Sequence, residues 1–359
     1  MRIHAVIVLC LCLAGCAHVA TPADTPVRHV LVVINSDSSD SREIGNYYVE
    51  KRNVPTDQVC RIRCTVDETI PVKDFDAQIA APIRAFVARK ELDGRIDYIV
   101  LTRGIPIKVE GSLPEGEGLA GPRSVDSLLT CLDNGLRPDK NPWLDNPYFK
   151  MDEPFSHKKF GIYLVTRLAA YNVPDAKDLI DHALAATPER SLFLFDVDPN
   201  RDNESFGKWN KQMIAASEAL EKHRFDVEVD KTDKFVTASG LMGYASWGSN
   251  DGHYDWQNYK KLSFSPGGIA ETYVSTSARS FVKQKEGQSE IGDLIAGGCT
   301  GVKGYVSEPY VVACCDVSNL FDRYTRGYNL AESFYAASPF IYWKDLVVGD
   351  PLCRPYPKL

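Results

Sequence analysis

The sequence lacks several features that would place it directly in a class of proteins. After the first twenty residues, no segment approaches the roughly 18 consecutive apolar residues of a membrane-spanning helix. The net charge is −7 and basic residues do not cluster, which argues against a nucleic-acid binder. The signatures GxxxxGK[ST], HExxH and GxSxG are also absent. Function therefore has to be inferred from the strands, the helices and the residues at strand ends.

Cysteine spacing indicates neither a zinc site nor a disulfide framework. Cys60 and Cys64 lie on one expected strand, which holds their Cα atoms too far apart to form a disulfide. Cys299 lies just before another expected strand, and we interpret it as a buried, inert thiol. Setting aside Cys10, Cys12 and Cys16, the remaining cysteines are Cys60, Cys64, Cys131, Cys299, Cys314, Cys315 and Cys353. Seven is an odd number, and their pairing stays open.

The amino terminus differs in composition from the rest of the chain. Arg2 precedes the unbroken apolar run Ala5–Ala14, which is typical of a secretory signal peptide. The run ends in Leu13-Ala14-Gly15-Cys16, which resembles the lipobox of bacterial lipoproteins. The resemblance implies cleavage after residue 15, acylation of Cys16 and a tether over residues 16–26. Because Ala17 and not Asp follows the cysteine, we expect a lipid-anchored envelope protein at the outer membrane, facing the periplasm.

Residues 27–359 predict a single large domain of the α/β class. Apolar runs such as Val27–Ile34 and Ile96–Thr102 alternate with amphipathic segments such as Phe75–Glu91. This alternation favours a mostly parallel sheet that is sandwiched by helices. We expect residues 27–110 and 158–359 to supply the sheet. Residues 111–157 are rich in Gly, Pro and Asn, and we expect irregular loops there.

The stretch from residue 240 to residue 280 holds the densest set of polar strand ends. Two apolar runs, Leu241–Ala245 and Gly268–Val274, each end in small polar residues. Carboxyl ends of parallel strands meet at one edge of a sheet, where ligands bind. We therefore expect Ser246–His253 and Ser275–Ser277 to lie side by side and to line a shared cleft.

Two family resemblances follow from longer motifs. The segments VLVVINSDSSDSREIGNYYVEKRNVP, LTRGIPIKV, GYASWGSND and VVGDPLCRPY resemble an uncharacterised bacterial family associated with exosortase, a membrane-bound sorting enzyme. More distantly, the chain is similar to gingipain-type cysteine peptidases, which have a caspase-like fold. Trp247 stands where their histidine would be, and Ser275-Thr276-Ser277 where their cysteine would be. The resemblance implies the fold, but the His–Cys pair needed for cysteine-peptidase activity is missing.

Two groups of residues at strand ends are candidates for a site. Asp251, His253 and either Ser275 or Ser277 could form a Ser/His/Asp arrangement, although a surface histidine beside a polar loop is the simpler interpretation. Convergence of polar groups at strand ends would form a binding cleft, although Arg–carboxylate pairs could instead lock the fold. The expected cleft residues are Ser36, Arg103, Asp126, Ser246, Ser249, Asn250 and Glu308.

A third candidate is a weak calcium site. Asp196, Asp198, Asn200, Asp202 and Glu204 alternate along one loop, and alternating oxygen ligands suit calcium. The glycine that allows an EF-hand loop to turn is absent, so a solvated acidic loop is the alternative. No other cofactor is expected.

Two functions are therefore open. In the first, the chain is an envelope lipoprotein that uses a peptidase-like scaffold to bind a protein or a glycan, such as an exopolysaccharide, in an exosortase-linked sorting system. In the second, it is a hydrolase that uses the Ser/His/Asp set at the sheet edge.

Overall fold

In the computed structural model, the described residues are 25–111, 121–134, 143–188 and 191–358. Cys16, where the sequence predicts acylation, lies outside these residues. Within the described part of the chain, no helix is long and apolar enough to cross a membrane.

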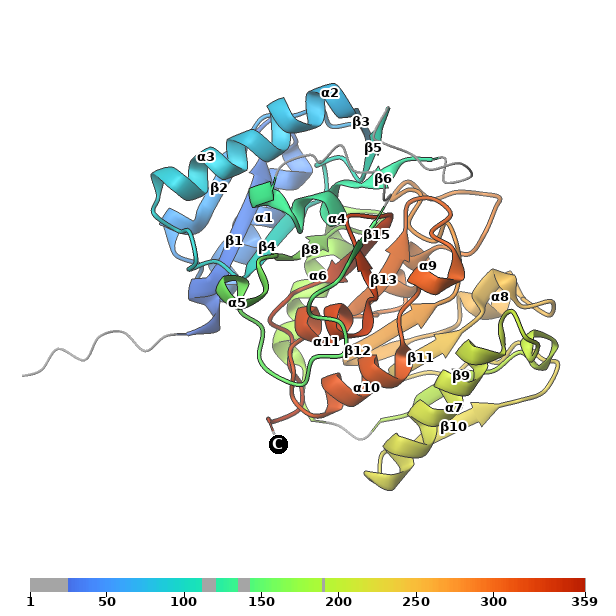
Figure 1. The fold of residues 1–359 in the computed structure, drawn as a ribbon. Coiled ribbons are helices and arrows are strands. Elements are labelled where there is room, and N and C mark those ends of the chain that lie inside the picture. Colours follow the sequence, from blue (N-terminus) through green and yellow to red (C-terminus); the bar gives the residue numbers. More distant parts are fainter. Residues whose placement is uncertain (1–24, 112–120, 135–142, 189–190, 359) are drawn as a thin grey trace, which may run out of the picture.

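A ten-stranded sheet forms the centre of the molecule (Figure 1). Its strand order is β10-β9-β11-β12-β13-β15-β8-β4-β1-β2. The strands are β1 (Val30–Asn35), β2 (Val59–Ile62), β4 (Tyr98–Thr102), β8 (Leu164–Leu168), β9 (Phe193–Asp196), β10 (Val227–Asp230), β11 (Leu241–Ser246), β12 (Phe264–Thr272), β13 (Gly301–Tyr305) and β15 (Asp345–Gly349). Neighbouring strands from β10 to β13 are parallel to one another, and so are neighbouring strands from β8 to β2. β15 runs antiparallel to β13. The predicted α/β class with a mostly parallel sheet is confirmed.

Helices cover both faces of the sheet. They are α1 (Ser39–Arg52), α2 (Val72–Phe75), α3 (Ala81–Arg89), α4 (Val125–Leu129), α5 (His157–Phe160), α6 (Val173–Ala185), α7 (Gly207–Lys222), α8 (Trp256–Tyr259), α9 (Ile291–Ala296), α10 (Val317–Thr325) and α11 (Leu330–Ala337). Helices α1, α6 and α9 form one contacting group, and α7, α10 and α11 form another. Gly301 and Gly304 of β13 show that the groups lie on opposite faces. A Cβ on Gly301 would meet Leu330 of α11, whereas a Cβ on Gly304 would meet Ile291 of α9.

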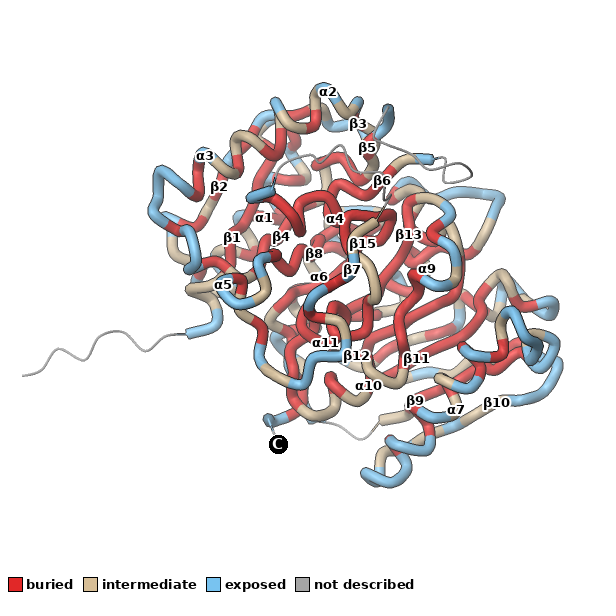
Figure 2. Tube along the Cα trace, in the orientation of Figure 1, coloured by how far each residue is buried: buried red, intermediate tan, exposed pale blue. Residues whose placement is uncertain are grey.

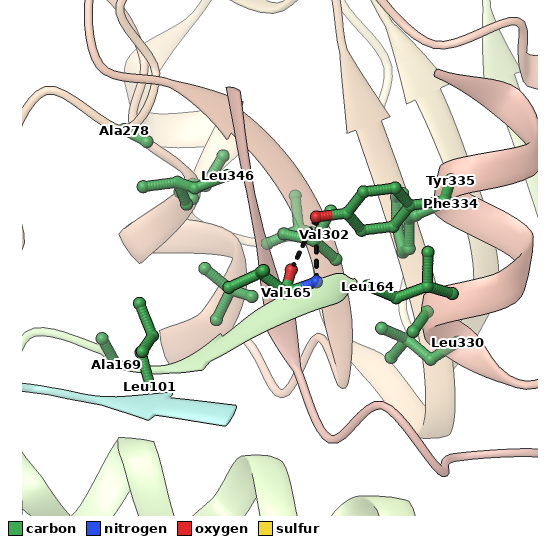
Figure 3. Packing of buried hydrophobic residues seen from close by; sticks show 14 of the residues in the cluster. Leu101, Leu164, Val165, Ala169, Ala278, Val302, Leu330, Phe334, Tyr335 and Leu346 are labelled. Carbon is green, nitrogen blue, oxygen red and sulfur yellow. Dashed lines mark hydrogen bonds between the residues drawn. The ribbon is translucent and has the colours of Figure 1, made fainter. Parts of the chain in front are cut away.

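The central strands are apolar because both of their faces are covered (Figure 2). β1, β4, β8 and β11 are buried along their whole length. β8 pairs with β15 only through Arg167 and Val348. Tyr335 of α11 supplies hydrogen bonds to a backbone position of β8 outside this pair. Its hydroxyl lies 3.0 Å from both the N–H and the carbonyl oxygen of Val165, so these buried backbone groups are paired (Figure 3).

Residues 111–157 supply no strand to the ten-stranded sheet within the described residues. β6 (Arg123–Ser124) joins β3 (Thr69–Pro71) and β5 (Lys108–Glu110) in a small sheet, and β7 (Leu144–Asp145) pairs with β14 (Phe340–Ile341). The segment from residue 143 to residue 157 packs over α11 through Asn146, whose amide donates hydrogen bonds to the carbonyl oxygens of Tyr335 and Ser338, both 2.8 Å away.

One expected helix is interrupted. The continuous helix expected over Phe75–Glu91 is divided by a π-helical turn at Asp76–Ala80, between α2 and α3. Pro82 follows the turn and has no N–H to donate to the residue four positions earlier. The backbone hydrogen bonds therefore change their spacing just before the proline.

Candidate functional site

Four neighbouring strands carry the loops that form a cavity of about 510 Å³, which we call the edge cavity. In sheet order these strands are β9, β11, β12 and β13. All four run parallel, so their carboxyl ends meet at one edge. The cavity is lined by Arg201, Phe206, Trp247, Asn250, Tyr273, Ser275, Glu308, Pro309, Tyr310, Val311, Val312 and Cys314. Its size and its mixture of apolar and polar groups are typical of a ligand-binding cavity.

Aromatic side chains form the inner wall of the edge cavity. The ring centroids of Trp247 and Tyr273 lie 5.0 Å apart, and each residue exposes only 2% of its surface. The indole N–H of Trp247 donates a hydrogen bond to Asn210 Oδ1 of α7, 2.7 Å away. At the opening, Tyr310 and Val312 are 38% and 51% exposed. The cavity therefore has a rigid aromatic wall and an apolar, solvent-facing opening.

Arg201 and Asn250 tie the loops of this cavity together. The guanidinium of Arg201 lies 5.2 Å from the ring centroids of both Phe206 and Trp247, and it donates a hydrogen bond to the carbonyl oxygen of Asn250. The Asn250 amide donates to the carbonyl oxygen of Tyr273, 2.6 Å away. The loops after β9, β11 and β12 are thus held in one arrangement.

The expected adjacency of the two polar strand ends is confirmed. β11 and β12 are parallel neighbours, with Ser246 opposite Thr272. The backbone N–H of Tyr273 donates to the Ser246 carbonyl oxygen at 3.0 Å, which fixes the start of the segment that contains Ser275. Asn250 and Ser275, one from each segment, share the edge cavity.

The structure does not assemble the Ser/His/Asp set as a proton relay. The side chain of His253 is 42% exposed, and its Nδ1 lies 3.7 Å from Asp251 Oδ1, which accepts the backbone N–H of His253 at 2.6 Å. Within the described residues, no hydrogen bond joins His253 to Ser275 or Ser277, and the buried hydroxyl of Ser277 has no hydrogen-bonding partner. A nucleophile needs its base within hydrogen-bonding reach, and that contact is missing here.

The expected single cleft is divided into two cavities. Asn250 and Glu308 line the edge cavity, whereas Arg103 lines a second cavity of about 320 Å³ beside β1, β4 and β8. Ser36, Asp126, Ser246 and Ser249 line neither. The physical reason is that β15 lies between β13 and β8, which separates the two groups of parallel strands.

Most of the expected cleft residues make structural contacts instead. Arg103 Nε lies 3.0 Å from Asp40 Oδ2, and its Nη1 donates to the carbonyl oxygens of Ala170 and Phe281. Asp126 forms a buried ion pair with Arg167.

The serines of the expected cleft also bond locally. Ser36 accepts a hydrogen bond from Arg42 through its carbonyl oxygen, and the Ser246 hydroxyl accepts the N–H of Gly248. Ser249 exchanges hydrogen bonds with Ser289. These contacts stabilise the loops of the sheet edge.

The acidic loop after β9 is not gathered into a calcium site. Asp198 accepts the backbone N–H of Asn200 at 2.8 Å, and Arg201 Nε lies 3.7 Å from its other oxygen. Asp202 and Glu204 are exposed. Arginine already supplies positive charge inside this loop, which the pattern of alternating oxygen ligands did not indicate. The sequence signal that could have revealed this positive charge is Arg201, the single basic residue among the alternating acidic residues.

Asp196 occupies an unusual position at the end of β9. It is 1% exposed, and among the described residues neither of its carboxylate oxygens makes a hydrogen bond of ordinary geometry. Burial, reinforced by the nearby carboxylate of Asp251, raises the pKa of Asp196 to about 8, against the opposing effect of the Val236 backbone. Without a bound cation, the carboxyl group is therefore mostly neutral at pH 7.

A buried charged network beneath the edge cavity was not predicted. Lys303 of β13 is fully buried, and its Nζ lies 3.3 Å from Asp345 Oδ2 and 2.9 Å from Ser338 Oγ. Glu271 accepts hydrogen bonds from the Tyr305 hydroxyl at 2.9 Å and from the N–H of Cys315 at 3.3 Å. Burial raises the pKa of Glu271 to about 7, against the opposing effect of Lys303. The sequence signal that could have indicated this network is Lys303, a lysine inside the apolar run Gly301–Val306.

Cys299 is a buried thiol, as the sequence predicted. All seven cysteines after residue 16 are buried thiols, and none is joined in a disulfide. Cys299 is 1% exposed, and burial raises its pKa well above the ordinary value.

Comparison with known proteins does not assign the chain to a family. No family model matches the sequence, and no curated protein matches it. A solved structure described as "Structure of Protease" is similar over 93% of this chain and 80% of that chain, with a TM-score of 0.48 and 12% sequence identity. A likeness this distant says nothing about activity. The chain has an α/β fold with a ten-stranded, mostly parallel sheet flanked by helices.

Proposed function

We propose that this chain is a lipid-anchored envelope protein that binds an extended segment of a partner protein in the edge cavity. The observation that carries the proposal is the cavity itself, which is formed by loops from four adjacent strand ends. The lipobox around Cys16 and the motif resemblance support an envelope location and a place in an exosortase-linked sorting system.

The wall of the cavity favours a polypeptide over a glycan. Glycans stack on broad, exposed aromatic faces, but Trp247 and Tyr273 are almost completely buried. The exposed apolar groups at the opening are the side chains of Tyr310 and Val312. An apolar side chain of a partner would bury its surface against them and gain about 25 cal/mol per Å². The exposed carboxylate of Glu308 at the same opening would select against an acidic neighbour.

Binding is favoured over hydrolysis by the position of His253. Its ring is exposed and makes no hydrogen bond to Ser275 or Ser277 within the described residues. The hydrolase alternative therefore stays a prediction without a supporting contact.

Site-specific photo-crosslinking tests the proposed function. A photoreactive benzoylphenylalanine at Val312, in cells that make the full-length protein, should crosslink one defined polypeptide. The additional substitution Trp247→Ala should weaken that crosslink, because it removes the wall of the cavity. The matched control is the same probe at Val66, which is similarly exposed but lines the second cavity. Two outcomes would contradict the proposal. One is the same pattern of crosslinks from the probes at Val312 and Val66. The other is that no polypeptide is crosslinked and the protein instead binds a glycan, with that binding abolished by Trp247→Ala.

A further inference from the structure

The side chains of Asp93, Asp133 and His157 converge near the amino ends of β4 and β8. Each of the three offers one potential ligand atom, and these atoms all lie within 4.8 Å of one another. Among the described residues, no other group of three meets this condition. Asp93 follows α3, Asp133 lies in the 3₁₀ turn Leu132–Asn134, and His157 begins α5. We propose that these three residues bind a divalent transition-metal ion, with Zn²⁺ as the best fit.

His157 is arranged as a metal-binding histidine. Its Nδ1 lies 3.0 Å from the carbonyl oxygen of Ile162, which can only accept a hydrogen bond. In the neutral ring Nδ1 therefore carries the proton, and Nε2 presents its lone pair. The ring is 6% exposed and stacks on Tyr163, with centroids 3.9 Å apart. A backbone carbonyl that fixes the tautomer in this way is typical of histidines that bind metals.

The distances suit a small tetrahedral ion. Ligand atoms about 2.0–2.1 Å from a tetrahedral centre lie roughly 3.3 Å from one another. His157 Nε2 and Asp133 Oδ2 are 3.2 Å apart. Asp93 is exposed, and its ligand oxygen lies within 4.8 Å of the other two ligand atoms, so a side-chain rotation that moves this oxygen by at most about 1.5 Å would bring it to the same spacing.

The charges around the group also favour a cation. Within the described residues, no lysine or arginine forms an ion pair with Asp93 or Asp133. A third carboxylate, Asp97, accepts the backbone N–H of His157 at 2.7 Å and lies 3.0 Å from His29 Nδ1. The Tyr163 hydroxyl donates to Asp133 Oδ1 at 3.2 Å and so orients that carboxylate from outside the group. A divalent ion would balance the two carboxylates of the group.

The ligand set selects the class of ion and its effect. An imidazole nitrogen disfavours Ca²⁺ and Mg²⁺, whereas a His-Asp-Asp set suits Zn²⁺, with water in the remaining position. The three ligands come from segments far apart in the sequence. The ion would therefore join the turn at Asp133 to the loop after α3, and it should stabilise the fold.

Calorimetric titration of ZnCl₂ into the chelator-treated, dialysed mature protein tests the site. The expected result is one bound ion per chain and a rise in the melting temperature. Asp93→Asn and His157→Ala should each weaken binding by at least about tenfold. The exposed residues His223 and Asp233 supply the matched controls His223→Ala and Asp233→Asn, which should bind as the parent does.

Two outcomes would overturn the proposal. One is the absence of zinc binding, which would leave His157 and Asp133 as an ion pair only. The other is equal affinity in the parent and in Asp93→Asn. Because Asp93 is exposed, its substitution should leave the fold intact, and this variant decides the matter even if His157→Ala does not fold.

Discussion

Arg167 and Asp126 form an ion pair that is closed off from solvent. Arg167 Nη2 lies 2.6 Å from Asp126 Oδ2, and the two side chains are 0% and 1% exposed. The Arg167 Nε–H also donates to Asp126, with Nε 3.1 Å from Oδ1, while Nη1 and Nη2 donate to the carbonyl oxygens of Ile105 and Pro106. The pair therefore joins β8 to α4 and to the loop after β4.

Breaking this pair should strongly destabilise the protein. Arg167→Met leaves the carboxylate of Asp126 buried without its partner, and we expect a loss of about 3–5 kcal/mol in the free energy of unfolding. Urea denaturation followed by circular dichroism measures the loss. The control is Arg63→Ala, which removes an exposed ion pair with Asp37 and should change the free energy by less than about 1 kcal/mol. Equal effects of the two substitutions would contradict the structural role given to Arg167.

The buried thiols should be unreactive in the folded protein. All seven are buried, and burial raises the pKa values of Cys60 and Cys353 to about 12. Iodoacetamide at pH 7.5 should label none of the seven in the native protein. After denaturation without a reductant, mass spectrometry should find all seven labelled. Fewer than seven labels would reveal a disulfide.

The proposed lipid anchor leads to a separate prediction about Cys16. Mass spectrometry of the membrane fraction should find a diacyl- or triacyl-cysteine at the mature amino terminus, because Leu13-Ala14-Gly15-Cys16 resembles a lipobox. Cys16→Ser should move the protein to the soluble fraction. A mature form that begins at another residue would end this interpretation.

The sheet was predictable from the sequence because it is buried. Strands covered on both faces are continuous apolar runs, so Val30–Asn35, Tyr98–Thr102 and Leu241–Ser246 were located within a few residues. The order of the strands follows from long-range pairing, which no local pattern encodes. The position of β15 between β13 and β8 was therefore missed, and with it the division of the expected cleft into two cavities.

The candidate sites were predictable only in part, for a related reason. Residue type and strand position indicated that Asn250, Ser275 and Glu308 would gather at one edge, and they do. The partner of each polar group depends on side-chain packing. Arg201 was missed for that reason, although it lies inside the loop expected to bind calcium.

The last prediction concerns the pH dependence of stability, through Asp196. Its pKa is about 8 in the folded protein and close to 4 in an unfolded chain. Between these values the unfolded state releases a proton that the folded state keeps. The free energy of unfolding should therefore decrease as the pH rises from about 4 to about 8.

Asp196→Asn removes this titration while keeping the size of the side chain. We expect the variant to be more stable than the parent by about 1–3 kcal/mol at pH 8, with little difference at pH 4. Melting temperatures of both proteins across this range measure the effect. Asp202→Asn is the matched control, because Asp202 lies on the same loop and is exposed, so it should not reproduce the gain in stability of Asp196→Asn at pH 8. If Asp196→Asn gained nothing at pH 8, or gained most at pH 4, the carboxyl group of Asp196 would have to be paired in solution.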